Sequence, residues 1–219
     1  MDSPHQFINL NTSIINVIKC LMAAVSFTLA APVFADDCSQ RLNSNELEGA
    51  FTICSEAAKQ GDAAAQLNLG FMHDFGKGMP QDDKQAVYWY RKAAEQGYAA
   101  AQYNVGLMYD NGEGTPKNDR QAVYWYSKAA EQGVADAQYN LGLMYDNGEG
   151  TPKNDRQAVR WYSKAAEQGY ADAQYNLGFM HDFGKGTLKD SILAYAWYNV
   201  SASQGQEQAI KNRGLIEKK

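Results

Sequence analysis

Four tryptophans recur at a fixed interval of 36 residues, at Trp89, Trp125, Trp161 and Trp197. Four glycines keep the same interval, at positions 70, 106, 142 and 178. A fixed interval of this length is typical of a solenoid, in which one supersecondary unit is copied and each copy buries its apolar face on its neighbours. Solenoids mostly offer an extended surface to another molecule rather than a closed catalytic pocket. The interval therefore predicts a binding scaffold, without saying what it binds.

Each copy reads as two helices joined by a turn. In the clearest copy the first helix has an apolar face with helical spacing, formed by Ala101, Val105, Met108 and Tyr109. Residues 110–116 hold two glycines and a proline, which predicts the end of that helix and a turn. The second helix is expected to begin at an N-cap supplied by Asn118 or Asp119.

The second helix of the same copy has an apolar stripe too, formed by Ala122, Trp125, Tyr126, Ala129 and Ala130. Gly133 follows it and is placed to be a left-handed C-terminal cap. Gly106 lets neighbouring helices approach closely, while Trp125 and Tyr126 are expected to fill the space between layers. Isolated helices of this length are marginal in water, so the stability must come from stacking.

The chain divides into a leader, a half-repeat, four repeats and a tail. Residues 45–60 align with the second helix of the following unit, so the stack is expected to open with a capping half-repeat. Residues after 205 align poorly with a first helix and are read as a polar C-terminal cap. The expected boundaries are 1–35, 36–61, 62–97, 98–133, 134–169, 170–205 and 206–219.

The first 35 residues have the layout of a secretory signal peptide. The apolar run of residues 20–31 follows Lys19, and cleavage is expected after Ala35 at a small-residue site. The run is shorter than the ~20 residues that a membrane-spanning helix needs. A retained membrane anchor is the alternative. After cleavage the chain would be soluble, either in the periplasm or secreted.

The two cysteines outside the leader, Cys38 and Cys54, predict a disulfide, because an even pair in an exported chain is usually oxidised. The bond would lock the first helix of the stack. A redox or metal-binding pair is the alternative, but the spacing is not C-x-x-C and no histidine lies nearby in the sequence.

Charge and motifs disfavour several classes of function. The net charge of −5 argues against nucleic acid or anionic lipid as the main partner, since both need a basic face. His73 and His181 lie three repeats apart, roughly 25–30 Å at the usual spacing of packed helices, too far to share a metal ion. Asp110 and Glu113 lack the ligand ladder of a calcium loop. We expect no enzyme, no metal and no cofactor.

The repeat resembles a known family. Residues 137–169, AQYNLGLMYDNGEGTPKNDRQAVRWYSKAAEQG, are similar to the Sel1-like repeat, a relative of the tetratricopeptide repeat, and the similarity extends over about residues 45–210. It implies a right-handed α-solenoid of antiparallel helix pairs. Members act as adaptors, and exported bacterial members serve envelope signalling, envelope maintenance or host contact. The first and fourth repeats depart from the pattern of this family: they have Phe-Met-His-Asp-Phe at 71–75 and 179–183, where the middle repeats have Leu-Met-Tyr-Asp-Asn.

The resemblance also suggests a binding face, because in related solenoids the first helix of each unit lines the concave groove. The candidate partner-binding residues share that face of the first helices: Tyr103, Leu107, Asp110, Asp136, Tyr139, Leu143, Asp146, Asp172, Tyr175, Phe179 and Asp182. The tyrosines alternatively pack within a layer. The aspartates of the last helical turn sit at the unfavourable end of the helix dipole, which indicates either a local bond to the turn or a binding role.

The sequence thus predicts a non-catalytic exported adaptor that binds a protein or peptide on its concave face, most simply as a monomer. Two alternatives remain open. One is an enzyme or accessory factor acting on peptidoglycan. The other is a structural protein that assembles with itself through its C-terminal end. Residues 107–133 and 143–169 differ only at Tyr124 and Arg160, so matching surface residues can reflect recent duplication alone.

Overall fold

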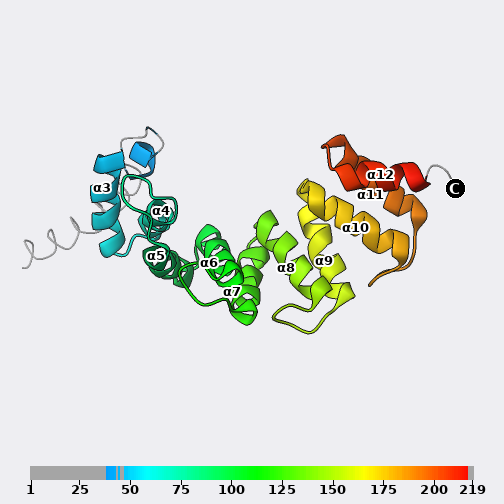
Figure 1. Cartoon of the computed structure of the whole chain (residues 1–219), viewed down its shortest axis with the longest axis horizontal. Coiled ribbons are helices and arrows are strands. Elements are labelled where there is room, and N and C mark those ends of the chain that lie inside the picture. Colours follow the sequence, from blue (N-terminus) through cyan, green and yellow to red (C-terminus); the bar gives the residue numbers. More distant parts are fainter. Residues whose placement is uncertain (1–37, 43, 45–46, 217–219) are drawn as a thin grey trace, which may run out of the picture.

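The computed structural model describes residues 38–42, 44 and 47–216, and every regular element in that part of the chain is a helix. The helices follow one another in pairs along an arc (Figure 1). This confirms the predicted all-α solenoid. After a short helical segment at 38–42, the helices are α3 Leu47–Lys59, α4 Ala63–Asp74, α5 Asp83–Glu95, α6 Ala99–Asn111, α7 Asp119–Glu131, α8 Ala135–Asn147, α9 Asp155–Glu167, α10 Ala171–Phe183, α11 Ser191–Ser203 and α12 Glu207–Ile216.

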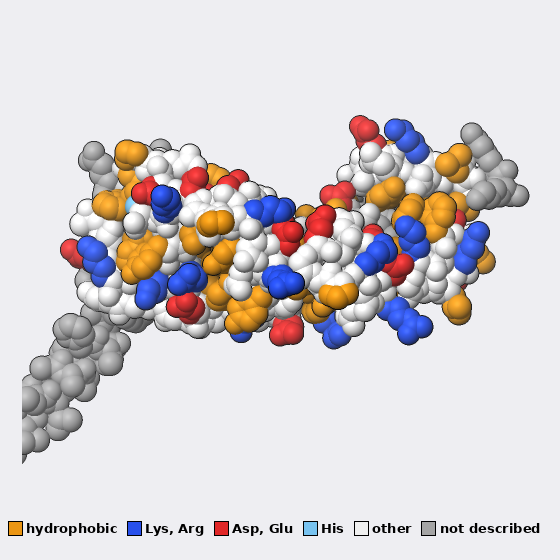
Figure 2. Space-filling view, turned by 60° about the horizontal axis from the view of Figure 1, so that its bottom comes forward, with side chains coloured by type: hydrophobic (Ala, Val, Ile, Leu, Met, Phe, Trp, Pro, Cys, Tyr) orange, Lys and Arg blue, Asp and Glu red, His pale blue; other side chains and the backbone are white. Residues whose placement is uncertain are grey.

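Each repeat supplies a first helix and a second helix. In the first two repeats the first helices, α4 and α6, lie nearer the hollow of the arc than the second helices, α5 and α7 (Figure 1). Figure 2 shows a face on which lysine and arginine side chains are interspersed with acidic and apolar ones.

Local capping explains where the helices begin and end. Asn118 is the N-cap of α7, and its side chain accepts a hydrogen bond from the Gln121 amide. Gly112 follows α6 with a φ of 77°, a left-handed conformation that suits glycine. The Asn118 amide then donates to the Tyr109 carbonyl at 2.8 Å and closes the turn. Gly133, with a φ of 94°, follows α7 as predicted.

A tyrosine forms the centre of each layer. Tyr126 is fully buried, and its ring lies against Gly106 of the preceding first helix. The same arrangement recurs at Tyr90, Tyr162 and Tyr198, each at most 1% exposed. We expected tryptophan to fill this space as well. Trp125 and Trp161 are buried, but the tryptophans of the outer repeats, Trp89 and Trp197, are only half-buried.

A row of glutamines links successive layers, and the sequence analysis did not anticipate it. Gln102 is buried and donates to the Ala94 carbonyl at 3.1 Å. Gln132 donates to the Gln102 side chain at 2.7 Å and to the Gly97 carbonyl at 3.0 Å. The same side-chain pair recurs in all four repeats, so a buried polar group is satisfied in each layer.

The disulfide predicted between Cys38 and Cys54 is present. Cys54 stands 36 residues before Tyr90, and Cys38 stands 36 residues before Asp74. The Tyr90 hydroxyl donates to the Asp74 carboxylate at 3.1 Å. The two cysteines therefore stand where the next repeat has a hydrogen-bonded tyrosine and aspartate. The disulfide ties α3 to the short helical segment that precedes it.

The C-terminal helix continues the repeat more closely than the sequence analysis expected. We read residues after 205 as a poorly aligned cap, but α12 packs on α11 in the position of a fifth first helix. Asn212 donates to the Tyr198 hydroxyl at 3.3 Å, and Gly214 lies 36 residues after Gly178. The alignment was obscured because the apolar residues of a first helix are replaced by polar ones such as Arg213.

The predicted signal peptide, residues 1–35, lies outside the described residues. Within residues 38–42, 44 and 47–216, the helices are all too short or too polar to cross a lipid bilayer.

Candidate partner-binding face

The predicted tyrosine row lies on the first helices and is half-buried. Tyr103, Tyr139 and Tyr175 occupy equivalent positions on α6, α8 and α10. One side of each ring packs within its own layer, since the centroids of Tyr103 and Tyr126 are 5.9 Å apart and those of Tyr175 and Tyr198 are 5.7 Å apart. These tyrosines therefore pack within their layer, as one of the two interpretations predicted, and the Tyr139 ring also stacks on Tyr170, with centroids 4.9 Å apart.

Burial keeps the phenols of Tyr103 and Tyr139 protonated. It raises the pKa of Tyr103 to about 12, and the nearby charge of Asp136 adds to the effect. The pKa of Tyr139 is also raised to about 12, first by burial and then by the charge of Asp172. Each hydroxyl is therefore neutral at physiological pH and can donate a hydrogen bond.

The aspartates of the last helical turn have partners inside the chain. The Tyr126 hydroxyl donates to Asp110 at 3.3 Å, and the Lys117 ammonium lies 3.6 Å from the same carboxylate. Asp146 pairs with Lys153 at 3.1 Å. Of the two interpretations left open for these residues, the local bond is thus present at both positions.

The aspartates at the start of the first helices are more accessible. Asp136 and Asp172 are exposed at the N-terminal turns of α8 and α10, where the helix dipole favours a carboxylate. Asp172 accepts a hydrogen bond from Gln206 at 3.3 Å. Asp182, at the other end of α10, is half-buried and adds to the raised pKa of Tyr198, which is mainly an effect of burial.

Two phenylalanine pairs stand at the ends of the row. The centroids of Phe71 and Phe75 are 4.6 Å apart, and those of Phe179 and Phe183 are 4.5 Å apart. Phe75 and Phe183 are each 60% exposed. The equivalent residues in the middle repeats are Leu–Asn pairs, with Leu107 and Leu143 half-buried. The sequence analysis noted the Phe-Met-His-Asp-Phe motif but gave its last residue no role.

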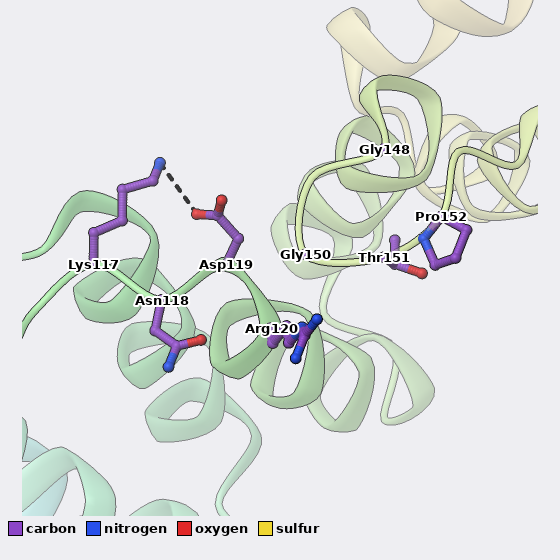
Figure 3. A pocket seen from close by; sticks show the side chains of 8 residues that line it. All are labelled: Lys117, Asn118, Asp119, Arg120, Gly148, Gly150, Thr151 and Pro152. Carbon is purple, nitrogen blue, oxygen red and sulfur yellow. Dashed lines mark ion pairs between the residues drawn. The ribbon is translucent and has the colours of Figure 1, made fainter.

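A hollow of about 440 Å³ opens beside the first phenylalanine pair, where the end of α4 meets α6. Its lining mixes carboxylates, amides and apolar groups: Asp74, Phe75, Gln81, Asp83, Asn104, Leu107, Met108, Asn111 and Glu113. A second hollow, of about 590 Å³, lies between the turns of the two middle repeats. Figure 3 shows its wall, with Lys117 beside Asp119 on one side and the turn from Gly148 to Pro152 on the other.

The side chains that could hold a metal ion are spread along the described residues. In the part of the chain that the structure describes, no three His, Cys, Asp or Glu side chains are grouped so that they could hold a metal ion. His73 lies against the Phe51 ring, with centroids 6.5 Å apart, and burial lowers its pKa. The face carries aromatic rings, tyrosine hydroxyls and carboxylates.

Comparisons with known proteins give a consistent picture. The family model described as Sel1 repeat matches residues 63–98, 99–134, 135–170 and 171–206. Comparison with curated proteins gives no match. A Sel1 repeat protein from Oxalobacter formigenes is 39% identical with a TM-score of 0.76, and the match covers 80% of this chain and 72% of that one. A protective antigen of uropathogenic Escherichia coli with an SLR fold is 40% identical with a TM-score of 0.73; the match covers 76% of this chain but only 36% of the antigen.

Proposed function

The chain belongs to the Sel1 repeat family, whose members generally act as scaffolds for protein interactions, and on that premise we propose that it binds a protein partner through the inner side of its arc. In this proposal it has no catalytic activity of its own. The inner face is the surface that the first helices α4, α6, α8 and α10 share, and its candidate contact residues are those predicted from the sequence together with Phe75 and Phe183.

The observation that carries the proposal is the exposure of aromatic side chains at both ends of one row. Phe75 and Phe183 are each 60% exposed, although burying a phenylalanine is favourable by about 1.5–3 kcal/mol. Between them the tyrosine row is only half-buried. Exposed apolar side chains that form a patch with a polar border are typical of sites for protein contact. A partner laid along the arc would cover these rings.

Charge favours a partner with basic or amide groups. The chain carries a net charge of −5, and Asp136 and Asp172 are exposed beside the tyrosines. Carboxylates at the border of an apolar surface steer a basic partner and set its register, while aromatic rings supply most of the contact energy. The neutral hydroxyls of the tyrosine row would donate to carbonyl groups of the partner.

We also infer that the protein is exported, to the periplasm or beyond the cell. The Cys38–Cys54 disulfide supports this, because such bonds persist in oxidising compartments. The apolar run at residues 20–31 supports it as well. The relative from uropathogenic Escherichia coli is a protective antigen, a role compatible with an exported protein.

A comparison of captured partners tests the proposal. The tagged chain would be expressed in its native host, crosslinked and purified, and its partners identified by mass spectrometry. The double variant Phe75→Ser/Phe183→Ser is expected to lose a partner that the wild type retains. The matched control is Tyr88→Ser/Tyr124→Ser, because these two tyrosines are 49% exposed on the outer helices α5 and α7. Equal capture by wild type and inner-face variant would refute the proposed surface.

A further inference from the structure

The hollow between α4 and α6 lacks a lysine that the equivalent positions of the two middle repeats supply. In the second repeat, the Lys117 ammonium lies 3.6 Å from Asp110 and 3.3 Å from Asp119. In the third, the Lys153 ammonium lies 3.1 Å from Asp146 and 3.2 Å from Asp155. Each middle repeat therefore pairs two carboxylates with one lysine of its own, which offsets one of their two charges.

The first repeat has the carboxylates without the lysine. Asp74 and Asp83 stand where the second repeat has Asp110 and Asp119, but Gln81 takes the place of Lys117. The Gln81 amide donates to Asp83 at 2.8 Å, and the Tyr90 hydroxyl donates to Asp74 at 3.1 Å. Among the described residues, no ion pair involves Asp74 or Asp83. The carboxylates are hydrogen-bonded, but their charge is not balanced.

A third carboxylate adds to the charge of the hollow. Glu113 lines it from the turn after α6, and this turn is held close because Gly114 packs on the backbone of Asp83. Burial raises the pKa of Asp74, the hydrogen bond from Tyr90 partly offsets this, and the charges of Glu113 and Asp83 raise the pKa again. A cation placed among the three carboxylates would relieve this repulsion.

The apolar lining suits the stem of a lysine side chain. Phe75 and Leu107 border the hollow together with Met108, and the amides of Asn104 and Asn111 lie around them. In the middle repeats, asparagine replaces phenylalanine at the position of Phe75. An aromatic ring near a cation adds a cation–π attraction, and long basic side chains bury their methylene groups along apolar surface.

We propose that this hollow is a subsite for a lysine side chain of the protein partner, with the ammonium between Asp74 and Asp83 and the methylene stem along Phe75 and Leu107. The inference rests on the proposed scaffold function and names the chemistry of one contact. Lys117 and Lys153 show inside the same molecule which group occupies such a carboxylate pair. Figure 3 shows one of them, with the Lys117 ammonium directed at Asp119. An arginine guanidinium in its place would be one outcome of the test.

The full chain labelled with ¹⁵N and titrated with n-butylammonium chloride tests the subsite, because this probe carries the head group and stem of lysine. Saturable shifts are expected in the side-chain amide signals of Gln81, Asn104 and Asn111. The shifts of Asn104 and Asn111 are expected to disappear in Gln81→Lys, which supplies the internal lysine, and to persist in Gln81→Met, which has similar length without charge. n-Butanol, the neutral analogue of the probe, is expected to cause no saturable shift.

The reciprocal variant Lys117→Gln frees Asp110 and Asp119, so a second set of saturable shifts is expected around Asn147 in the next repeat. Equal shifts in wild type and Gln81→Lys, or none in wild type, would overturn the subsite. Stronger shifts with n-propylguanidinium than with n-butylammonium would overturn its preference for lysine.

Partner capture separates this inference from the proposed function. If the wild type captures a partner that the inner-face variant loses, while n-butylammonium fails to bind, the scaffold stands and the lysine subsite falls. If n-butylammonium binds as expected and the inner-face variant captures the same partners as wild type, the ammonium site stands and the proposed function falls.

Discussion

The ring of Tyr126 lies directly on the backbone of Gly106, so close that a β-carbon on residue 106 would stand 2.5 Å from the Cδ1 atom of the ring. Gly70, Gly142 and Gly178 stand in the same relation to the tyrosines of their own repeats. The contact joins the two helices of a repeat at the centre of the layer. It explains why glycine and tyrosine recur together every 36 residues, because neither can change without the other.

Gly106→Ala is therefore expected to destabilise the protein, although alanine is the better helix former. Overpacking of a dense interior costs about 1–3 kcal/mol, and the favourable helix propensity offsets at most about 1 kcal/mol of this. The free energy of unfolding is measured by urea titration. Gly214→Ala is the control, because nothing lies within 4 Å of a β-carbon at that position. Equal effects at positions 106 and 214 would contradict the close-contact account.

Trp125→Ala is expected to lower the free energy of unfolding by about 3–5 kcal/mol, the usual range for truncating a large buried aromatic side chain. Trp125 is 6% exposed, whereas its neighbour Tyr124 is 49% exposed. Tyr124→Ala should therefore change the stability by less than about 0.5 kcal/mol. A loss below about 1 kcal/mol for Trp125→Ala would show that the ring contributes little to the stack.

Much of this fold follows from spacing alone. The helix faces, the turns and the cap at Asn118 could be predicted because glycine, proline and the apolar stripes have strong local preferences. That Tyr126 is more deeply buried than Trp125 could not be predicted, since both residues belong to one apolar stripe. Only the position of Gly106 decides which of the two rings is enclosed. The glutamine row was also missed, because a buried glutamine looks like a surface residue in sequence.

The candidate site could be predicted only in outline. The tyrosine row and the last-turn aspartates were found from their spacing, but Lys117 comes from the turn, and its pairing with Asp110 depends on the folded path of the loop. The exposure of Phe75 and Phe183 was equally hidden, because an apolar residue at the end of a helix reads as core. The substitution of Gln81 for lysine was visible in sequence and became meaningful only with the geometry.

Reduction of the Cys38–Cys54 disulfide is expected to loosen α3 and leave the middle of the stack intact. A loop of this size contributes about 3 kcal/mol in the chain-entropy model, and a solenoid transmits stability mainly between neighbouring repeats. Hydrogen exchange with and without reductant measures this, and protection should fall in α3 and α4 but not in α8. Loss of protection along the whole chain would mean that the stack unfolds as one cooperative unit.

The ionised Asp74 carboxylate should make the protein less stable at neutral pH. Its pKa in the folded state is raised above the ordinary value of 3.8, so the folded chain holds the proton more tightly than the unfolded chain. Protonated Asp74 therefore stabilises the folded chain. This stabilisation is fully present below the pKa that Asp74 has in the unfolded chain, and it is lost as the pH rises through the pKa that Asp74 has in the folded chain. Asp74→Asn should therefore raise the melting temperature at about pH 7 and lose this advantage near about pH 3.

Gln81→Lys tests independently whether repulsion between Asp74 and the neighbouring carboxylates lowers the stability at neutral pH. The added ammonium should pair with Asp74 and Asp83 as Lys117 does with its own two carboxylates, so the variant should also melt at a higher temperature than wild type at about pH 7. Gln81→Met is its neutral control. A pH-independent difference between wild type and Asp74→Asn would contradict the electrostatic explanation.

The most direct test of the account is site-specific photocrosslinking in the native host, with p-benzoylphenylalanine replacing Phe183 on the inner face or Tyr124 on the outer face. We expect a discrete crosslinked protein from position 183 and none from position 124, because Phe183 ends the proposed contact row and is 60% exposed, whereas Tyr124 lies on the outer helix α7. The same protein crosslinked from both positions, or from position 124 alone, would contradict binding through the inner side of the arc.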